Sequence, residues 1–237
     1  EIYGALLDLL YKHRMLVVPL ITDRYNARFD CSIDRVIQGS DKDPPIYTMG
    51  NWTRSWIKIM KQYENVVAIC VENELDGTPF SAQEILTYMN WLKGLVRSLT
   101  DLPITSKLMY DWGPQETKKS VFATVDFPCA DVYAVDLSTL RRDLEKWKVF
   151  LQQNHQRTLG YWVAELNKKS APSNWYADAP NFTFEYVQAV LNSGASMAVL
   201  WVMNRIQDQR SAFFGLNGDP LNTLLTIAPQ IPEIQKM

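Results

Sequence analysis

Continuous apolar runs recur along the chain, and stretches with the spacing of amphipathic helices separate them. Such a run is typical of a parallel strand whose two faces are both covered by helices. The runs predict six strands, at residues 15–21, 66–71, 103–109, 131–137, 159–164 and 197–203.

The stretches between these runs predict helices, because their apolar residues return to one face with a period near 3.6. Ser81 and Glu84 form a capping-box pattern ahead of one helix. Gly194 follows another and predicts its stop. Helical spacing covers residues 52–63, 85–95, 140–153 and 182–191.

Strands that alternate with helices form a parallel sheet, which is either open or closed into a barrel. An open dinucleotide-binding sheet carries a glycine-rich first turn, and this sequence has no GxGxxG or Walker-type loop. A TIM (β/α)8-type barrel is therefore the predicted fold class, as a single domain over residues 1–237. Six strands in place of eight predict an incomplete barrel.

The composition narrows the classes of function. The net charge is −2, so the chain has no excess of positive charge that would indicate binding to nucleic acid or to an acidic membrane. No run of residues is long and apolar enough to span a bilayer. Only two histidines are present, so a histidine-rich metal site or a Ser-His-Asp triad is not expected. Aromatic residues make up 12% of the chain, which suits either a large core or flat surfaces for sugars.

Two glutamates follow apolar runs that predict strands. Glu74 comes after residues 66–71, and Glu165 comes directly after residues 159–164. Active sites of barrels with alternating strands and helices lie at the C-terminal ends of the strands. Two carboxyl groups that face one another there can cleave a glycosidic bond. The alternative for each glutamate is an N-cap or a salt-bridge residue at the start of a loop.

Asn73-Glu74 after a buried strand resembles the acid/base motif of the clan A retaining glycosidases. Family 5, with its cellulases and β-mannanases, is the most similar family. The resemblance implies that Glu74 is the general acid/base, that Glu165 is the nucleophile and that Asn73 binds the sugar 2-hydroxyl. It also implies a sugar-binding Trp201 on the last strand, and residues 213–220 resemble the turn after that strand. The first two strands of the family barrel are then missing.

A retaining mechanism needs one protonated and one ionised carboxyl group. Glu74 is expected to be the protonated one, because partial burial and a negative neighbour raise a carboxyl pKa. Glu72 is a rival for this role, since it shares strand parity with Glu74, and Asp76 is a weaker candidate.

Further candidates for sugar binding lie near or after the C-terminal ends of the predicted strands, although each is also compatible with an ordinary polar loop. They are Tyr25, Tyr110, Trp112, Asp136 and Trp175. Family 5 also has an aromatic hydroxyl near strand six that supports the nucleophile. At that place residues 133–138 offer Asp136 and Ser138, which departs from the family pattern.

The sequence therefore predicts hydrolysis of a β-linked oligo- or polysaccharide, of the endo-β-1,4-glucanase or mannanase type, without a cofactor or a metal. The alternative is a non-catalytic carbohydrate-binding remnant, or a fragment of a larger glycosidase. An open barrel exposes strand edges, so a homodimer that covers the edge is also expected. Neither a nucleic acid nor a membrane is an expected partner. Secretion is an expectation from the family alone.

Overall fold

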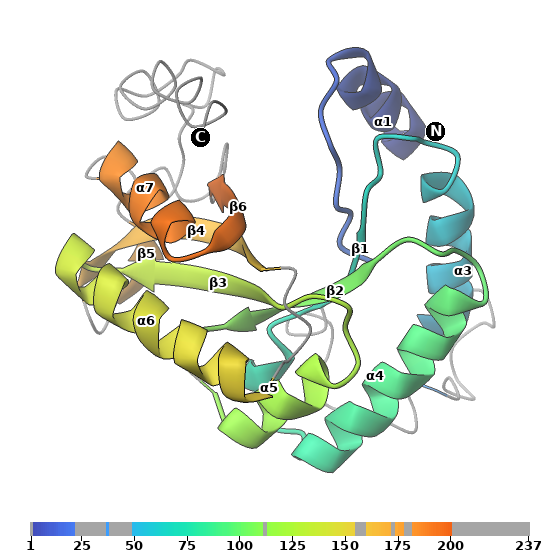
Figure 1. Ribbon diagram of the computed structural model, residues 1–237. Coiled ribbons are helices and arrows are strands. Elements are labelled where there is room, and N and C mark those ends of the chain that lie inside the picture. The colour runs from blue at the N-terminus through green and yellow to red at the C-terminus, as the bar shows by residue number, and fades with distance from the viewer. Residues whose placement is uncertain are drawn as a thin grey trace. The chain divides into compact units, whose positions relative to one another are not determined.

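The computed structural model describes residues 2–21, 37, 49–110, 113–154, 160–171, 174–177 and 182–200. Two compact units make up the chain, Glu1–Pro128 and Cys129–Met237. Strands alternate with helices through both units (Figure 1). None of the helices in the described ranges has the length and apolar character of a membrane span.

The first unit contains two parallel strands and their helices. Apolar side chains of the two strands (residues 69–73 and 104–109) and of the helix at residues 82–97 form its core. Ile69, Leu92 and Ile104 have no exposed surface there. The elements are α1 (Ile2–Lys12), α3 (Met49–Met60), β1 (Ile69–Asn73), η2 (Leu75–Gly77), α4 (Ala82–Arg97), β2 (Ile104–Met109) and α5 (Gln115–Phe122). Strands β1 and β2 pair in parallel.

Residues 15–21 form an irregular strand in this unit. Parallel bridges join Val17 and Leu20 to the segment 66–70. Pro19 lies between these bridges and has no N–H to donate, so the ladder is interrupted where a regular strand was predicted.

Local sequence signals account for α4 and α5. The capping box predicted at Ser81 is present: the Ser81 hydroxyl accepts the Glu84 N–H, and Glu84 accepts the Ser81 N–H. Helix α5 was not predicted, because its sequence QETKKSVF is mostly polar. It begins after Pro114, which suits the start of a helix.

The second unit is built around β4 (Tyr161–Ala171), which pairs in parallel with β3 (Cys129–Ala134) and with β6 (Ala195–Leu200). The short strand β5 (Asn174–Ala177) runs antiparallel to β4 and was not predicted. Residues 201–203, the end of the last predicted strand, lie outside the described ranges.

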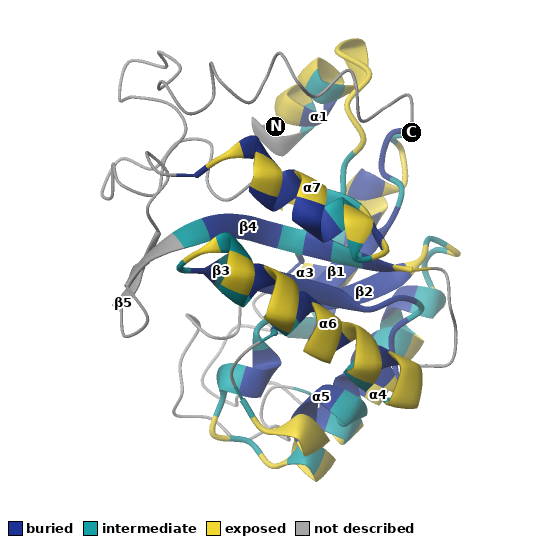
Figure 2. Ribbon diagram, turned by 60° about the vertical axis from the view of Figure 1, so that its left-hand side comes forward, coloured by how far each residue is buried: buried dark blue, intermediate teal, exposed yellow. Residues whose placement is uncertain are grey.

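Two amphipathic helices complete the second unit, α6 (Leu137–Asn154) and α7 (Phe184–Asn192). Figure 2 shows buried and exposed positions alternating along both helices, as a 3.6-residue period requires. The buried stripe of α6 consists of Leu140, Leu144, Trp147 and Leu151. Gly194 has a φ of +97° directly after α7, which confirms the predicted helix stop.

Candidate active site

Glu74 stands where β1 gives way to a tight turn. Its backbone is left-handed, with φ 47° and ψ 44°, and it leads into η2. The N–H of Glu74 donates to the carbonyl of Lys107 on β2, at 2.8 Å. A non-glycine residue in this region costs about 1–3 kcal/mol, and such residues are concentrated at functional sites. The half-buried Glu74 is therefore a candidate on backbone grounds as well as by its motif.

Strand β1 contains a bulge shortly before the turn at Glu74. Cys70 is opposite Thr105, but Asn73 is opposite Lys107, so β1 holds one residue more than β2 over this stretch. A bulge changes which face the following side chains occupy. Strand β1 ends at Asn73 and Glu74 is left-handed, so the predicted strand parity of Glu72 and Glu74 does not apply.

Glu72 is a buried structural carboxylate. It has no exposed surface, and the Tyr88 hydroxyl of α4 donates to its Oε1. The Ser106 hydroxyl of β2 donates to its backbone carbonyl, at 3.0 Å. These contacts hold Glu72 on the side of the strand that α4 covers, which removes it as a rival for the acid/base role.

Asp76, the weaker candidate, belongs to a buried ion pair. Its side chain forms a salt bridge with Lys118 of α5, and it accepts the Met109 N–H at 3.2 Å. Burial raises the pKa of the Asp76 carboxyl, although the Lys118 ammonium and the Met109 N–H oppose the shift. Asp76 therefore has a role in holding the turn after Glu74 and no surface to offer a substrate.

Glu165 lies within β4 and not at its end. The apolar run ends at Ala164, but the strand continues to Ala171, which corrects the predicted position. The pairing with β3 shifts here: Ala130 is opposite Val163, and Asp131 is opposite Glu165. Ala164 is thus the extra residue of a second bulge, and the bulge aligns Glu165 with Asp131.

The Glu165 carboxylate is buried and accepts a hydrogen bond. The Tyr133 hydroxyl of β3 donates to Oε2 of Glu165 at 2.5 Å, and Glu165 is only 7% exposed. A short, charge-assisted bond of this kind orients a carboxylate strongly. The sequence-based statement that this stretch lacks a supporting aromatic hydroxyl is therefore wrong, because Tyr133 provides one.

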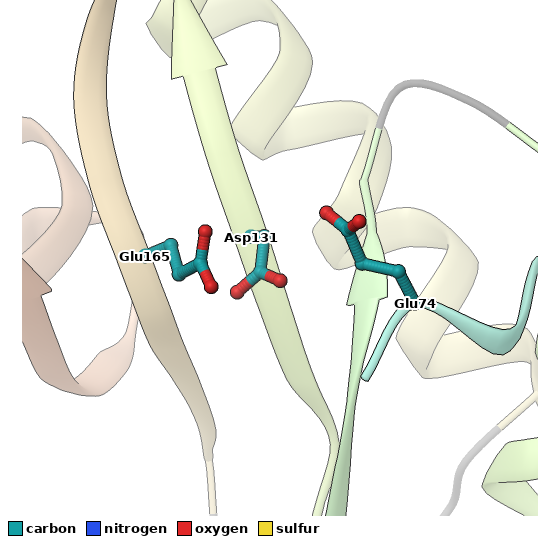
Figure 3. Close-up of side chains that lie close together, drawn as sticks. All are labelled: Glu74, Asp131 and Glu165. Atoms are coloured by element: carbon teal, nitrogen blue, oxygen red, sulfur yellow. The ribbon is translucent and has the colours of Figure 1, made fainter. Parts of the chain in front are cut away.

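Asp131 is a further carboxyl group next to Glu165 that the sequence analysis did not select. It is 1% exposed, and the two residues bring carboxylate oxygens within 4.8 Å (Figure 3). The odd positions Asp131 and Tyr133 share one face of β3, and that alternation was the signal available in the sequence. Carboxylate oxygens are also the ligands that hard cations prefer, so a cation would compete with Tyr133 for Glu165.

Asp136 closes the N-terminal turn of α6. It accepts the Thr139 N–H and the Ser138 hydroxyl, both at 2.7 Å, and these bonds lower the pKa of its carboxyl. The predicted strand over residues 131–137 ends at Ala134, so Asp136 is a capping residue in the structure. Sugar binding by Asp136 would have to compete with this cap.

The remaining candidates divide between the two units. Asn73 is the last residue of β1 and Tyr110 directly follows the adjacent β2, so both lie at C-terminal strand ends in the first unit. Glu74, also labelled in Figure 3, belongs to that unit, and Glu165 belongs to the second. Trp175 lies on β5, of which the backbone is described. Tyr25, Trp112, Trp201 and residues 213–220 lie outside the described ranges.

Solved structures of similar fold are glycosidases. The β-glucuronidase of Ruminococcus gnavus matches 91% of this chain with a TM-score of 0.62 at 12% identity. The β-glucuronidase 2 of Bacteroides uniformis matches 91% with a TM-score of 0.59 at 13% identity. The exo-β-1,4-mannosidase Op5Man5 of Opitutaceae bacterium strain TAV5 matches 83% with a TM-score of 0.57 at 14% identity.

The likeness extends over less than half of each of those proteins. This chain spans 40% of the first, 28% of the second and 42% of the third. No protein-family model matches the sequence, and no curated protein matches it either. At these identities the comparison establishes the fold class: the chain has an α/β fold of the TIM-barrel type, as the alternation of strands and helices predicted.

Proposed function

We propose that this chain is a retaining β-glycoside hydrolase in which Glu165 is the nucleophile and Glu74 is the general acid and base. The observation that carries the proposal is the buried Glu165 carboxylate, which is oriented by the Tyr133 hydroxyl in a fold whose structural neighbours are β-glycosidases. A nucleophile must be held in one direction to attack, and a hydrogen-bonded side chain on a strand is held in this way.

The reaction would proceed by double displacement. The Glu165 carboxylate attacks the anomeric carbon while Glu74 donates its proton to the glycosidic oxygen, and the leaving alcohol departs. A glycosyl ester on Glu165 remains. Glu74, now a carboxylate, takes a proton from water as that water attacks the anomeric carbon. The sugar leaves, Glu165 is a carboxylate again and Glu74 is protonated.

The position of Glu74 supports the other half of the proposal. Its left-handed backbone and half-buried side chain follow Asn73 at the C-terminal end of β1, the end at which barrel enzymes build their sites. Asn73 is proposed to hydrogen-bond the sugar 2-hydroxyl. The proposal requires Glu74 and Glu165 to face one another across the scissile bond.

The substrate is proposed to be a β-linked glycoside. The neighbours are named as β-glucuronidases and as an exo-β-1,4-mannosidase, so glucuronides and mannosides are the first sugars to test. The Asn73-Glu74 motif resembles that of family 5, so β-glucans and β-mannans are also proposed as substrates to test. An enzyme specific for one of these polysaccharides is the narrower form of the proposal.

The test is hydrolysis of 4-nitrophenyl β-D-glucuronide, β-D-mannoside and β-D-glucoside by the wild-type chain. Glu165→Gln and Glu74→Gln should each lower kcat by about 10³-fold or more, because each removes a group that takes part directly in bond making or proton transfer. Glu145→Gln, on the exposed side of α6, is the matched control and should retain wild-type activity. Early product should be the β-anomer by NMR.

Three outcomes contradict the proposal in whole or in part. An active chain whose Glu165→Gln variant keeps most of its activity would exclude Glu165 as the nucleophile. Binding of these sugars with no turnover would favour a non-catalytic carbohydrate-binding protein. An early α-anomer would leave a glycosidase but exclude the retaining mechanism.

A further inference from the structure

The ion pair between Asp76 and Lys118 lies directly behind the turn that carries Glu74. Asp76 is 2% exposed and Lys118 is 4% exposed. The Lys118 ammonium donates both to Asp76 and to the carbonyl of Met109, the last residue of β2. One lysine of α5 therefore joins the η2 turn to the end of the neighbouring strand.

The backbone around Asp76 is also tightly fixed. The Gly77 N–H donates to the Glu74 carbonyl at 2.9 Å, and the Met109 N–H donates to Asp76. Gly113 approaches so closely that a Cβ there would lie 2.6 Å from the Asp76 carbonyl oxygen. The turn is thus held by contacts from β2, from α5 and from the segment between them.

A buried ion pair is an inefficient way to stabilise a fold, because desolvation offsets much of its attraction. Apolar residues of similar volume usually serve stability as well. The presence of the Asp76–Lys118 ion pair is therefore better explained by the backbone conformation of the turn that it holds. Here the turn begins with the left-handed Glu74.

We propose that Asp76 and Lys118 are positioning residues for Glu74: their buried pair locks η2 to α5 and β2, and so fixes the left-handed backbone from which Glu74 presents its carboxyl group. This inference rests on the proposed role of Glu74 as the general acid. It assigns to the pair no contact with the substrate.

The test uses the leaving group of the substrate, because a misplaced acid affects only leaving groups that need a proton. An alkoxide needs protonation to depart, whereas 2,4-dinitrophenolate departs without it. The substrates are therefore the methyl and the 2,4-dinitrophenyl β-glycosides of the sugar that the wild-type chain hydrolyses. The quantity compared is kcat/KM, which reports the first displacement.

The main variant is Asp76→Asn with Lys118→Met, which removes both charges at nearly constant volume. It should lower kcat/KM for the methyl glycoside by about 10²-fold, and for the dinitrophenyl glycoside by less than about 3-fold. Equal losses on both substrates, or no loss, would overturn the inference. If the double variant does not fold, Asp76→Asn alone is assessed by the same criterion.

The matched control is Arg97→Met with Asp126→Asn. This pair also joins a helix of the first unit to β2, since Asp126 accepts the N–H of Ile104 at the opposite end of the strand. The control should lower the melting temperature but leave the ratio of the two kcat/KM values unchanged. A changed ratio in the control would show that any loosening of β2 has this effect.

Hydrogen exchange separates this inference from the proposed function. If the wild-type chain hydrolyses none of the glycosides, the proposed function fails. The exchange rates of the amides of residues 75–78 still show whether the Asp76–Lys118 pair holds the η2 turn in place. Faster exchange at these amides in the Asp76/Lys118 variant but not in the Arg97/Asp126 variant would support the inference that the ion pair fixes the turn. Unchanged exchange would overturn it.

Discussion

The Tyr133 hydroxyl donates a 2.5 Å hydrogen bond to the buried Glu165 carboxylate, from one parallel strand to the next. Two features of the backbone make this bond possible. Tyr133 and Asp131 lie on the same face of β3, and the bulge at Ala164 turns Glu165 toward that face. The geometry gives one carboxylate in the second unit a fixed direction.

Removal of this bond should weaken catalysis. Tyr133→Phe is expected to lower kcat by about 10- to 100-fold, because a hydrogen bond to a charged group contributes about 1.5–3 kcal/mol. Steady-state kinetics on the best aryl glycoside measures the effect. Tyr161→Phe is the control, since Tyr161 on β4 bonds to Ser193 and not to Glu165. Full activity in Tyr133→Phe would show that the bond has no catalytic role.

A methyl group at Gly113 should destabilise the turn behind Glu74. Gly113 has a φ of +84°, and a Cβ would meet the Asp76 carbonyl oxygen at 2.6 Å. Gly194 has a φ of +97° but open space around its Cβ position. Gly194→Ala should therefore cost about 1–2 kcal/mol of stability, from the backbone alone. Gly113→Ala should cost about 1–3 kcal/mol more, from the clash. Urea denaturation of both variants checks this, and equal losses would contradict it.

The capping box of α4 predicts a pH-dependent contribution to stability. The Ser81 hydroxyl and N–H both donate to Glu84 and lower the pKa of its carboxyl below the ordinary 4.5. A carboxyl with a lowered folded-state pKa adds stability above its unfolded pKa, and loses it as the pH falls through the folded value. Wild type should therefore exceed Glu84→Gln in stability at pH 7, and the difference should shrink as the pH falls below 4.5. A constant difference from pH 7 to pH 3 would contradict this.

Self-association is expected at the N-terminal part of the first unit. Large apolar side chains are exposed there, with Leu9 at 52% and Leu16 at 74%. Among the described residues, the strand at 15–21 pairs only on the side facing β1. Leu9→Glu with Leu16→Glu should shift sedimentation toward the monomer, and Val149→Glu on α6 is the control. A wild-type chain that stays monomeric at every concentration would contradict the expected homodimer.

The amino-acid pattern located most of the elements but not the orientation of the site. Apolar runs located the strands, because a strand that is buried on both faces consists of consecutive apolar residues. Ser81 and Gly194 marked helix ends through contacts within a few residues. The polar α5 was missed, since its place depends on packing against the rest of the first unit.

The errors at the candidate site arise where tertiary contacts or a change of element override simple alternation. Bulges at β1 and β4 depend on pairing with a distant strand, so simple alternation along one strand cannot locate them. Alternation also cannot show that Tyr133 reaches a residue on the next strand. Asp136 was read as a strand end because Leu137 continues the apolar pattern, although the helix begins there.

The central claim is that Glu74 and Glu165 act on one glycosidic bond. The most direct measurement is the distance between their nearest carboxyl oxygens in a crystal structure with a bound sugar. A retaining glycosidase requires about 5–5.5 Å, and this is the separation that we predict. A separation of about 6.5–9.5 Å would indicate an inverting enzyme and contradict the double displacement. A much larger one would show that the two glutamates do not share a site.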